Sequence, residues 1–178
     1  MFRETSIPGC LEIELPVSRD KRGSFTKSFR RDWWHQAGLK TEFLEEYHTL
    51  SGRGVLRGLH FQLPPRAVAK LVYCPWGEVL DAVVDLRSGS PAYGRHQLFD
   101  LKDTALYLPR GLAHGFYVLS DSALMVYKVS DYYAPELDAG ILWDSAGIPW
   151  PDEKPLISNR DAGFPDLKDF KTPFRFEG

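Results

Sequence analysis

The chain lacks the features that mark several classes of protein. It has only two cysteines in 178 residues, Cys10 and Cys74, without a metal-binding spacing, so we expect buried free thiols and a cytoplasmic location. No apolar run approaches the roughly 18 residues that span a membrane, and we expect no signal peptide. The net charge of -2 lacks the basic excess of nucleic-acid-binding proteins. We therefore expect no membrane and no nucleic acid among the partners.

Several catalytic motifs are missing as well. The five histidines stand singly, with no His-x-His pair and no carboxylate a few residues beyond His60. Metal sites in small β-barrels typically need two or three histidines and a carboxylate at close spacing. No nucleophile motif and no glycine-rich phosphate loop occurs. We therefore expect neither a metal ion nor another cofactor.

The chain does contain many short β-type runs, separated by glycine and proline, and 43% of its residues are hydrophobic. Residues 78–87 alternate polar positions (Asp81, Asp85, Arg87) with apolar ones, which predicts a strand with one apolar and one polar face. Further strands are predicted at residues 10–15, 24–29, 57–62, 70–74, 96–101, 105–108, 114–119 and 123–130. The length suits a single domain, residues 1–178.

The remaining segments are predicted to contain little regular structure. A short helix is expected at residues 31–37, ended by Gly38. The segment after Pro149 is rich in proline, aspartate and lysine, and we expect it to run over the surface as irregular chain. The pattern as a whole predicts an all-β barrel or sandwich.

The run from Arg57 to Gln62, followed by Lys70, offers the most chemistry. Histidine, with a pKa of roughly 6.5, accepts a proton near neutral pH, and lysine stabilises developing negative charge. A hairpin through residues 63–69 would set Lys70 opposite His60 on the neighbouring strand. Strand alternation separates Arg57 from His60, so both reach one pocket only if the strand bulges at Gly58. Although a lone histidine is more often structural, this cluster favours proton transfer beside a ketone.

Two other side chains each have two interpretations. His114 follows a turn with proline and glycine at the start of a predicted strand, and a structural role explains it as well as a functional one. Tyr127 lies on an otherwise apolar strand, where a core tyrosine with a satisfied hydroxyl is the usual explanation. A phenol is also a suitable proton donor to a carbanion if it faces the base across a substrate.

Ten segments carry a resemblance to a known family: residues 20–25, 55–62, 70–72, 77–79, 84–87, 111–116, 127–128, 132–135, 141–144 and 155–161. In this order they closely resemble the dTDP-4-dehydrorhamnose 3,5-epimerase family, from about residue 7 to 161. The resemblance implies an all-β, cupin-type jelly-roll barrel without a metal, usually a homodimer. It also implies a nucleotide-sugar substrate, a nucleotide-linked 4-keto-6-deoxy sugar that the enzyme epimerises.

The resemblance implies roles for individual residues. His60 would be the general base, polarised by Asp161, while Lys70 would stabilise the enolate and Tyr127 would protonate the opposite face. Protons on C3 and C5 are acidic because C4 is a ketone, so this chemistry needs no cofactor. The substrate-binding positions implied in the same way are Arg22, Phe25, Lys27, Tyr47, Arg57, Gln62, His114, Asp138 and Arg160.

Two segments depart from the family pattern in the part of its pocket that receives nucleotide and sugar. The family commonly has Phe-x-Glu where this chain has Phe25-Thr26-Lys27, and Gln-Asp-Asn-His where it has Glu45-Glu46-Tyr47-His48. Lys27 could change which substrate is held, or pair with Glu45 or Glu46.

We expect an epimerase of dTDP-4-keto-6-deoxyglucose at C3 and C5, on the route to L-rhamnose. One alternative is an epimerase at C3 or C5 alone, on a dTDP-, CDP- or GDP-linked sugar. A non-catalytic sugar-binding cupin is the other, and the retained catalytic set argues against it.

Overall fold

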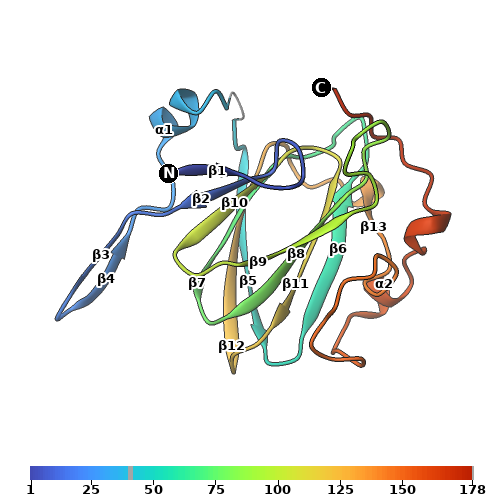
Figure 1. Cartoon of the computed structure of the whole chain (residues 1–178). Helices are drawn as coiled ribbons and strands as arrows, with labels where there is room; N and C mark the ends of the chain where they lie inside the picture. Colours follow the sequence, from blue (N-terminus) through green and yellow to red (C-terminus); the bar gives the residue numbers. More distant parts are fainter. Residues whose placement is uncertain (40–41, 178) are drawn as a thin grey trace.

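The computed structural model describes residues 1–39 and 42–177, whose strands form two facing sheets (Figure 1). Within this part of the chain, the larger sheet runs from edge to edge as β1 (Phe2–Glu4), β2 (Leu11–Glu14), β10 (Thr104–Leu108), β7 (Lys70–Trp76), β12 (Ser122–Val129) and β5 (Glu45–Gly52). The smaller sheet runs as β13 (Asp138–Gly140), β6 (Leu56–Gln62), β11 (Leu112–Val118), β8 (Val79–Asp85) and β9 (His96–Asp100). Neighbouring strands in both sheets are antiparallel.

The main core lies between the two sheets. Met125 and Tyr127 of β12 alternate with more exposed neighbours, as expected for a strand with one face turned inward. From the facing sheet, Val83 and Phe116 are almost completely buried in the same cluster. The prediction of an all-β architecture is therefore confirmed.

The C-terminal segment, which follows β13, covers the outer face of the smaller sheet (Figure 1). Val84 and Leu86 pack there against Ile148 and Phe174. As predicted, the segment is mostly irregular; its helical turns are α2 (Asn159–Ala162) and the 3-10 turn η2 (Leu167–Asp169), and another 3-10 turn, η1 (Pro135–Leu137), precedes β13. Because of this cover, the smaller sheet is buried on both faces.

Strand β8 shows the consequence. Its polar positions are not on a solvent face, because Asp81 and Asp85 are fully buried and point into the barrel. Asp81 is hydrogen-bonded to His114, and Asp85 binds Arg87 and Ser90. Internal partners therefore replace water for the polar face that the sequence predicted.

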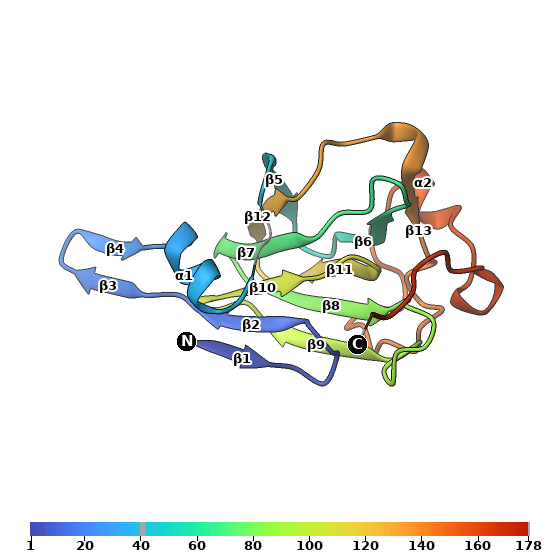
Figure 2. The same ribbon diagram turned by 90° about the horizontal axis from the view of Figure 1, so that it is seen from above.

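A hairpin and a short helix lie outside the two sheets. Strands β3 (Val17–Asp20) and β4 (Gly23–Thr26) form a two-stranded ribbon that extends away from the barrel (Figures 1 and 2). Helix α1 (Arg31–Gln36) lies where it was predicted and is fixed by its buried Trp34. The ribbon is exposed along most of its length, which is unusual because an isolated hairpin is marginally stable in water.

The predicted strands are present with shifted ends, whereas β1, β3, β5 and β13 were not predicted. Strand β5 is the important omission, because it is eight residues long and contributes to the site below. It is an edge strand with mostly exposed, polar residues, so it has little of the apolar alternation that marks a strand.

Two expectations from composition concern the cysteines and membrane spans. Both cysteines are free, as predicted, with Cys10 buried and Cys74 half-buried. Burial raises the pKa of Cys10 to about 12 and that of Cys74 to about 11, so both remain thiols at neutral pH. In residues 1–39 and 42–177, no helix is long and apolar enough to cross a membrane.

Candidate active site

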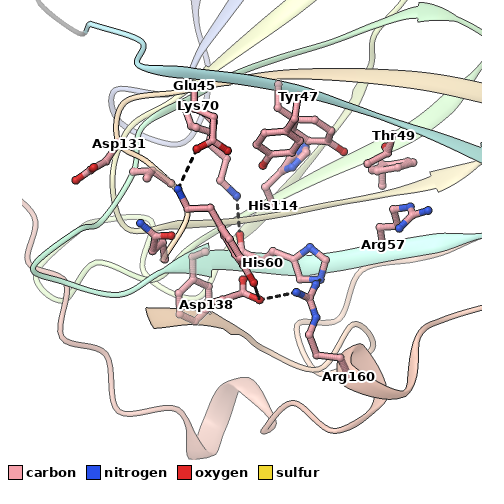
Figure 3. A pocket seen from close by; sticks show the side chains of 17 residues that line it. Glu45, Tyr47, Thr49, Arg57, His60, Lys70, His114, Asp131, Asp138 and Arg160 are labelled. Carbon is pink, nitrogen blue, oxygen red and sulfur yellow. Dashed lines mark hydrogen bonds and ion pairs between the residues drawn. The ribbon is translucent and has the colours of Figure 1, made fainter. Parts of the chain in front are cut away.

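A cavity of about 370 Å³ opens between the two sheets (Figure 3). It brings together nine of the thirteen side chains that the sequence assigned to the site, and a tenth, Asp161, lies directly behind His60. The nine are Tyr47, Arg57, His60, Gln62, Lys70, His114, Tyr127, Asp138 and Arg160. Arg22, Phe25 and Lys27 do not line it.

A bulge in β6 turns both Arg57 and His60 into the cavity, as predicted. His114 pairs with His60 and Phe116 with Arg57, so three steps along β6 match two along β11. Gly58 is needed at this point because its φ is +146° and an added Cβ would lie 2.6 Å from the Cα of Gly115. Arg57 is held in turn by the hydrogen bond that its Nε donates to Ser51 Oγ at 2.9 Å.

Lys70 reaches His60 by a different route from the predicted hairpin. Strands β6 and β7 belong to different sheets, so the hairpin prediction is wrong and residues 63–69 cross from one sheet to the other. The Lys70 side chain reaches across the interior to the backbone of His60, where Nζ donates a hydrogen bond to the carbonyl oxygen at 3.0 Å (Figure 3). Burial lowers the pKa of Lys70 to about 8, which leaves it mostly protonated at neutral pH.

Asp161 is fixed against His60 by the first turn of α2. Its Oδ2 lies 2.9 Å from His60 Nε2 and accepts a hydrogen bond from the Gly58 N–H, while its Oδ1 accepts one from the Ser158 hydroxyl. Burial alone would raise the pKa of Asp161, but the bonds from His60, Gly58 and Ser158 outweigh it and hold this pKa below its usual range. Asp161 is therefore a permanent anion behind the imidazole.

Several groups act on His60 itself. Burial lowers the pKa of His60, Asp161 raises it, and the cations of Lys70 and Arg160 lower it again, so that it lies below its usual value. Arg160 extends from α2, with Nη2 2.8 Å from His60 Nε2 and Nη1 bound to Asp138 (Figure 3). A neutral His60 at physiological pH is a proton acceptor.

Tyr127 lies on the wall opposite His60, because β12 belongs to the larger sheet and β6 to the smaller one. Its ring stacks on Tyr47, its direct partner on β5, with centroids 4.9 Å apart and planes 16° apart. The rings of His114 and Tyr127 form a T-shaped pair, with centroids 6.0 Å apart. Burial raises the pKa of Tyr127 far above its usual value, so the phenol keeps its proton at physiological pH.

A second histidine–aspartate pair lies deeper, where His114 Nε2 is 2.7 Å from Asp81 Oδ2 and both side chains are buried. Burial raises the pKa of Asp81, an effect that His114 opposes. This pairing was not predicted, because the alternation along residues 78–87 indicates a polar strand face at Asp81. Its position among apolar neighbours on β8 was the available signal, since a buried carboxylate requires a partner.

Gln62 lines the cavity, and its amide is bonded to backbone groups on either side. Its Nε2 donates to the carbonyl oxygens of Arg66 and Tyr132 at 2.6 and 3.2 Å, and its Oε1 accepts from the Ala134 N–H at 3.0 Å. These bonds occupy both amide hydrogens. Gln62 thus joins the two loops beside the cavity and has no free donor for a ligand.

The three predicted residues outside the cavity lie in or next to the β3–β4 hairpin. Arg22 is exposed and bound to Asp20, and 66% of Phe25 is exposed. Lys27 Nζ lies 6.0 Å from the ring centre of Trp33. The pairing of Lys27 with Glu45 or Glu46 is not found, because Glu46 binds Lys128 and Glu45 accepts from the Tyr133 N–H.

Other cavity residues were missed as site residues. Thr49 comes from β5, which was not predicted as a strand, and Asp131 and Tyr133 come from the loop after β12; Glu45 of β5 also lines the cavity, in a segment that the resemblance had placed in the family pocket. In the described part of the chain, no group of three or more His, Cys, Asp or Glu side chains has an arrangement that could hold a metal ion.

Comparison with known proteins matches this arrangement to one family. A family model described as dTDP-4-dehydrorhamnose 3,5-epimerase matches residues 4–169. The protein of that name from Shigella flexneri is 44% identical over 164 residues, which cover 89% of this chain and 91% of that protein.

Solved structures agree. The structure of dTDP-6-deoxy-D-glucose-3,5-epimerase RmlC from Legionella pneumophila Philadelphia 1, in complex with dTDP-4-keto-L-rhamnose, has a TM-score of 0.94 at 34% identity, covering 100% of this chain and 99% of that one. A double mutant of ChmJ, a 3'-monoepimerase from Streptomyces bikiniensis in complex with dTDP, has a TM-score of 0.87 at 35% identity, covering 93% and 86% of the two chains. The likeness confirms the predicted all-β fold of cupin type.

Proposed function

Because the chain belongs to the dTDP-4-dehydrorhamnose 3,5-epimerase family and is an epimerase of sugar nucleotides, we propose that its substrate is dTDP-4-keto-6-deoxyglucose, inverted at C3 and C5. The C4 ketone makes the neighbouring protons acidic, so each inversion consists of proton removal, an enolate and return of a proton to the other face. This chemistry requires a base, an acid on the opposite side and a stabiliser of the enolate oxygen.

His60 is the base in this proposal. It is neutral at physiological pH, lines the cavity and has a permanently charged carboxylate 2.9 Å from Nε2. Once the ring accepts a proton, Asp161 stabilises the imidazolium through an ion pair that is shielded from water. The same carboxylate is held by Gly58 and Ser158, so the orientation of the pair is fixed before substrate arrives.

Lys70 is the enolate stabiliser. Its ammonium has three N–H groups, and the His60 carbonyl oxygen takes one of them. The other two are free to donate to an oxyanion, and burial makes each charge-assisted bond stronger than it would be in water. A preorganised donor of this kind typically contributes 10²–10³-fold to a rate, about 3–4 kcal/mol.

Tyr127 is the acid. Its high pKa keeps it protonated, and it approaches the cavity from the sheet opposite His60. In this scheme Arg57, His114 and Arg160 bind the sugar and the diphosphate, because they place cationic or hydrogen-bonding groups on the remaining cavity wall. The observation that carries the proposal is that His60 and Tyr127 line one cavity from opposite sheets, with Lys70 bonded at the same point.

Deuterium exchange tests the reaction. The protein is incubated in deuterium oxide with dTDP-4-keto-6-deoxyglucose, and NMR follows exchange at C3 and C5. We expect exchange at both carbons, its loss in His60→Ala, and slower or misdirected turnover in Tyr127→Phe. His35→Ala, which changes an exposed histidine of α1 outside the cavity, is the control and should behave as wild type. Wild-type exchange by His60→Ala would contradict the assignment of the base.

A narrower epimerase is the second candidate. Tyr47 and Glu45 occupy cavity positions where the family commonly has amides, and the Tyr47 ring covers one face of Tyr127. Such crowding beside the acid favours protonation at one carbon over the other. Exchange at C3 or C5 alone, or turnover of only a CDP- or GDP-linked sugar in the same experiment, would identify this candidate.

We also propose a homodimer in which the β3–β4 hairpin reaches the partner's cavity. The hairpin holds Arg22 and Phe25 away from its own cavity. Leu50, Leu124 and Trp76 lie opposite one another on β5, β12 and β7, so their side chains share one face of the larger sheet. Leu50 and Trp76 are 66% and 67% exposed, and an apolar patch of this kind is a typical docking surface.

Light scattering and complementation test the dimer. Leu50→Glu should convert a dimer into a monomer. An equal mixture of refolded Phe25→Ala and His60→Ala proteins should regain about a quarter of wild-type activity, because half of the dimers then contain one complete site. A wild-type monomer, or no recovery on mixing, would contradict this arrangement.

We propose the cytoplasm as the compartment. Two free thiols suit a reducing environment, and nucleotide sugars are a substrate class consistent with it.

A further inference from the structure

Two groups approach the same ring nitrogen of His60, although only one of them can form a hydrogen bond with it at a time. Arg160 Nη2 is 2.8 Å from Nε2, and Asp161 Oδ2 is 2.9 Å from it. A guanidinium only donates hydrogen bonds and a carboxylate only accepts them. If Nε2 has its lone pair free, it accepts from Arg160, and if it is protonated, it donates to Asp161. One of the two contacts is therefore always unmade.

The position of Arg160 selects the tautomer of the neutral imidazole. With the guanidinium at hydrogen-bond distance, the ring proton lies on Nδ1 and the basic lone pair on Nε2 is occupied. If Arg160 moves away, Nε2 takes the proton and donates to Asp161. The lone pair is then on Nδ1, which has no hydrogen-bond partner in the described residues. Only this second arrangement combines a free lone pair with the support of the carboxylate.

Arg160 is held by contacts that an anion can replace. Its Nη1 binds Asp138 of β13 and its Nε lies 3.1 Å from Asp161 Oδ1. Half of its side chain is exposed, so a ligand can reach it from the cavity mouth. A phosphate oxygen forms the same charge-assisted bonds as a carboxylate and competes with Asp138 for the guanidinium.

We propose that Arg160 is a positioning residue that blocks the lone pair of His60 until an anionic group of the substrate draws the guanidinium away and switches the tautomer. Identification of that group as a diphosphate rests on the proposed function. The anion changes the tautomer because it binds Arg160 only in the displaced position. Proton abstraction is thereby coupled to occupation of the cavity by the correct end of the substrate.

The charged groups around His60 fix the direction of the accompanying pKa change. They are Arg160 and Asp161 on α2, Lys70 on β7, Asp138 on β13, His114 opposite it on β11, and Arg57 on its own strand. Arg160 and Lys70 lower the pKa of His60, and Asp161 raises it. Removal or neutralisation of Arg160 therefore raises this pKa.

Nitrogen NMR of ¹⁵N-histidine-labelled protein reads the tautomer directly, since protonated and unprotonated ring nitrogens have different shifts. Spectra are recorded for wild type, Arg160→Ala and Arg66→Ala, each with and without inorganic pyrophosphate. Arg66 is the matched control, because it pairs with Asp131 beside the same cavity and has no bond to His60.

We expect the Nδ1–H tautomer in free wild type and in Arg66→Ala, and a shift to Nε2–H when pyrophosphate is added. Arg160→Ala should show Nε2–H under both conditions, with a higher pKa for His60. The Nε2–H form in free wild type, an unchanged tautomer in Arg160→Ala, or no effect of pyrophosphate on wild type would overturn the proposal. No turnover is measured, so failure to epimerise any 4-keto sugar would refute the proposed function and leave this result standing.

Discussion

Replacement of Lys70 by methionine should make the protein more stable while it removes activity. Lys70 is 7% exposed, and burial lowers its pKa from an ordinary value of 10.5 to about 8. In the unfolded chain the ammonium is fully hydrated. Below pH 8 both states are protonated, so the folded protein bears the whole cost of the buried charge, about 3 kcal/mol.

Methionine has a similar shape and no charge, so Lys70→Met removes that cost. It also removes the hydrogen bond to the His60 carbonyl oxygen, which contributes about 1 kcal/mol. The net gain at pH 7 is about 2 kcal/mol, which for a chain of this size raises Tm by roughly 4–8 °C. The gain should fade as pH rises from about 8 to 10.5, because wild-type Lys70 then loses its proton in the folded state first.

Urea unfolding and thermal melts at neutral and alkaline pH measure the effect, with deuterium exchange as the activity assay. Lys171→Met, at an exposed position, is the control and should change stability by less than about 0.5 kcal/mol. Exchange by Lys70→Met should fall by about 10²–10³-fold. The reasoning is refuted if Lys70→Met is less stable than wild type at pH 7, or if its extra stability persists at alkaline pH.

Further predictions concern the other catalytic groups. As pH increases, exchange rates should first rise through a pKa below the usual value for histidine, because only neutral His60 accepts a proton. They should then fall near pH 8, because Lys70 loses its charge there. An exchange rate that still increases above about pH 9 would contradict this. Asp161→Asn should lower kcat by about 10²-fold, because a carboxylate this close to His60 shifts the pKa of the imidazole by about 1–3 units. Stopped assays on folded protein measure kcat, and a loss below about threefold would argue against an ion pair between the two residues. Asp81→Asn should raise KM more than it lowers kcat, because Asp81 holds His114, which lines the cavity and is not the base in the scheme. Steady-state kinetics test this, and a change confined to kcat would contradict a substrate-binding role for His114.

The fold class was predictable because strand signals depend on local alternation, but the pairing of strands was not. Residues 63–69 suit a hairpin and a crossing between sheets equally well by composition, and only the closed sandwich brings Lys70 to His60 from the facing sheet. Strand β5 was missed because an edge strand with a polar outer face has a weak pattern. The Gly58 bulge was predictable because two residues needed on one side stood an odd number of positions apart.

The site residues also fall into two groups: those that a local motif identifies, and those whose surroundings depend on the folded chain. Side chains that match a motif, such as His60, Lys70 and Tyr127, were identified with their neighbours. Asp81 was not, because the sequence of β8 shows a polar side without showing what covers it. Gln62 lies in the cavity wall, but its amide is engaged by backbone groups of two loops that only the folded chain brings together.

The cover on the smaller sheet has a consequence for biosynthesis. A ribosome releases the strands of both sheets before it releases Asp161 and Phe174, so the barrel can assemble while its outer apolar face has no cover. Until the last segment emerges, Val84 and Leu86 face water, and His60 has no carboxylate behind it. The nascent chain is thus both prone to aggregate and inactive, and the docking of one late segment ends both conditions at the same moment.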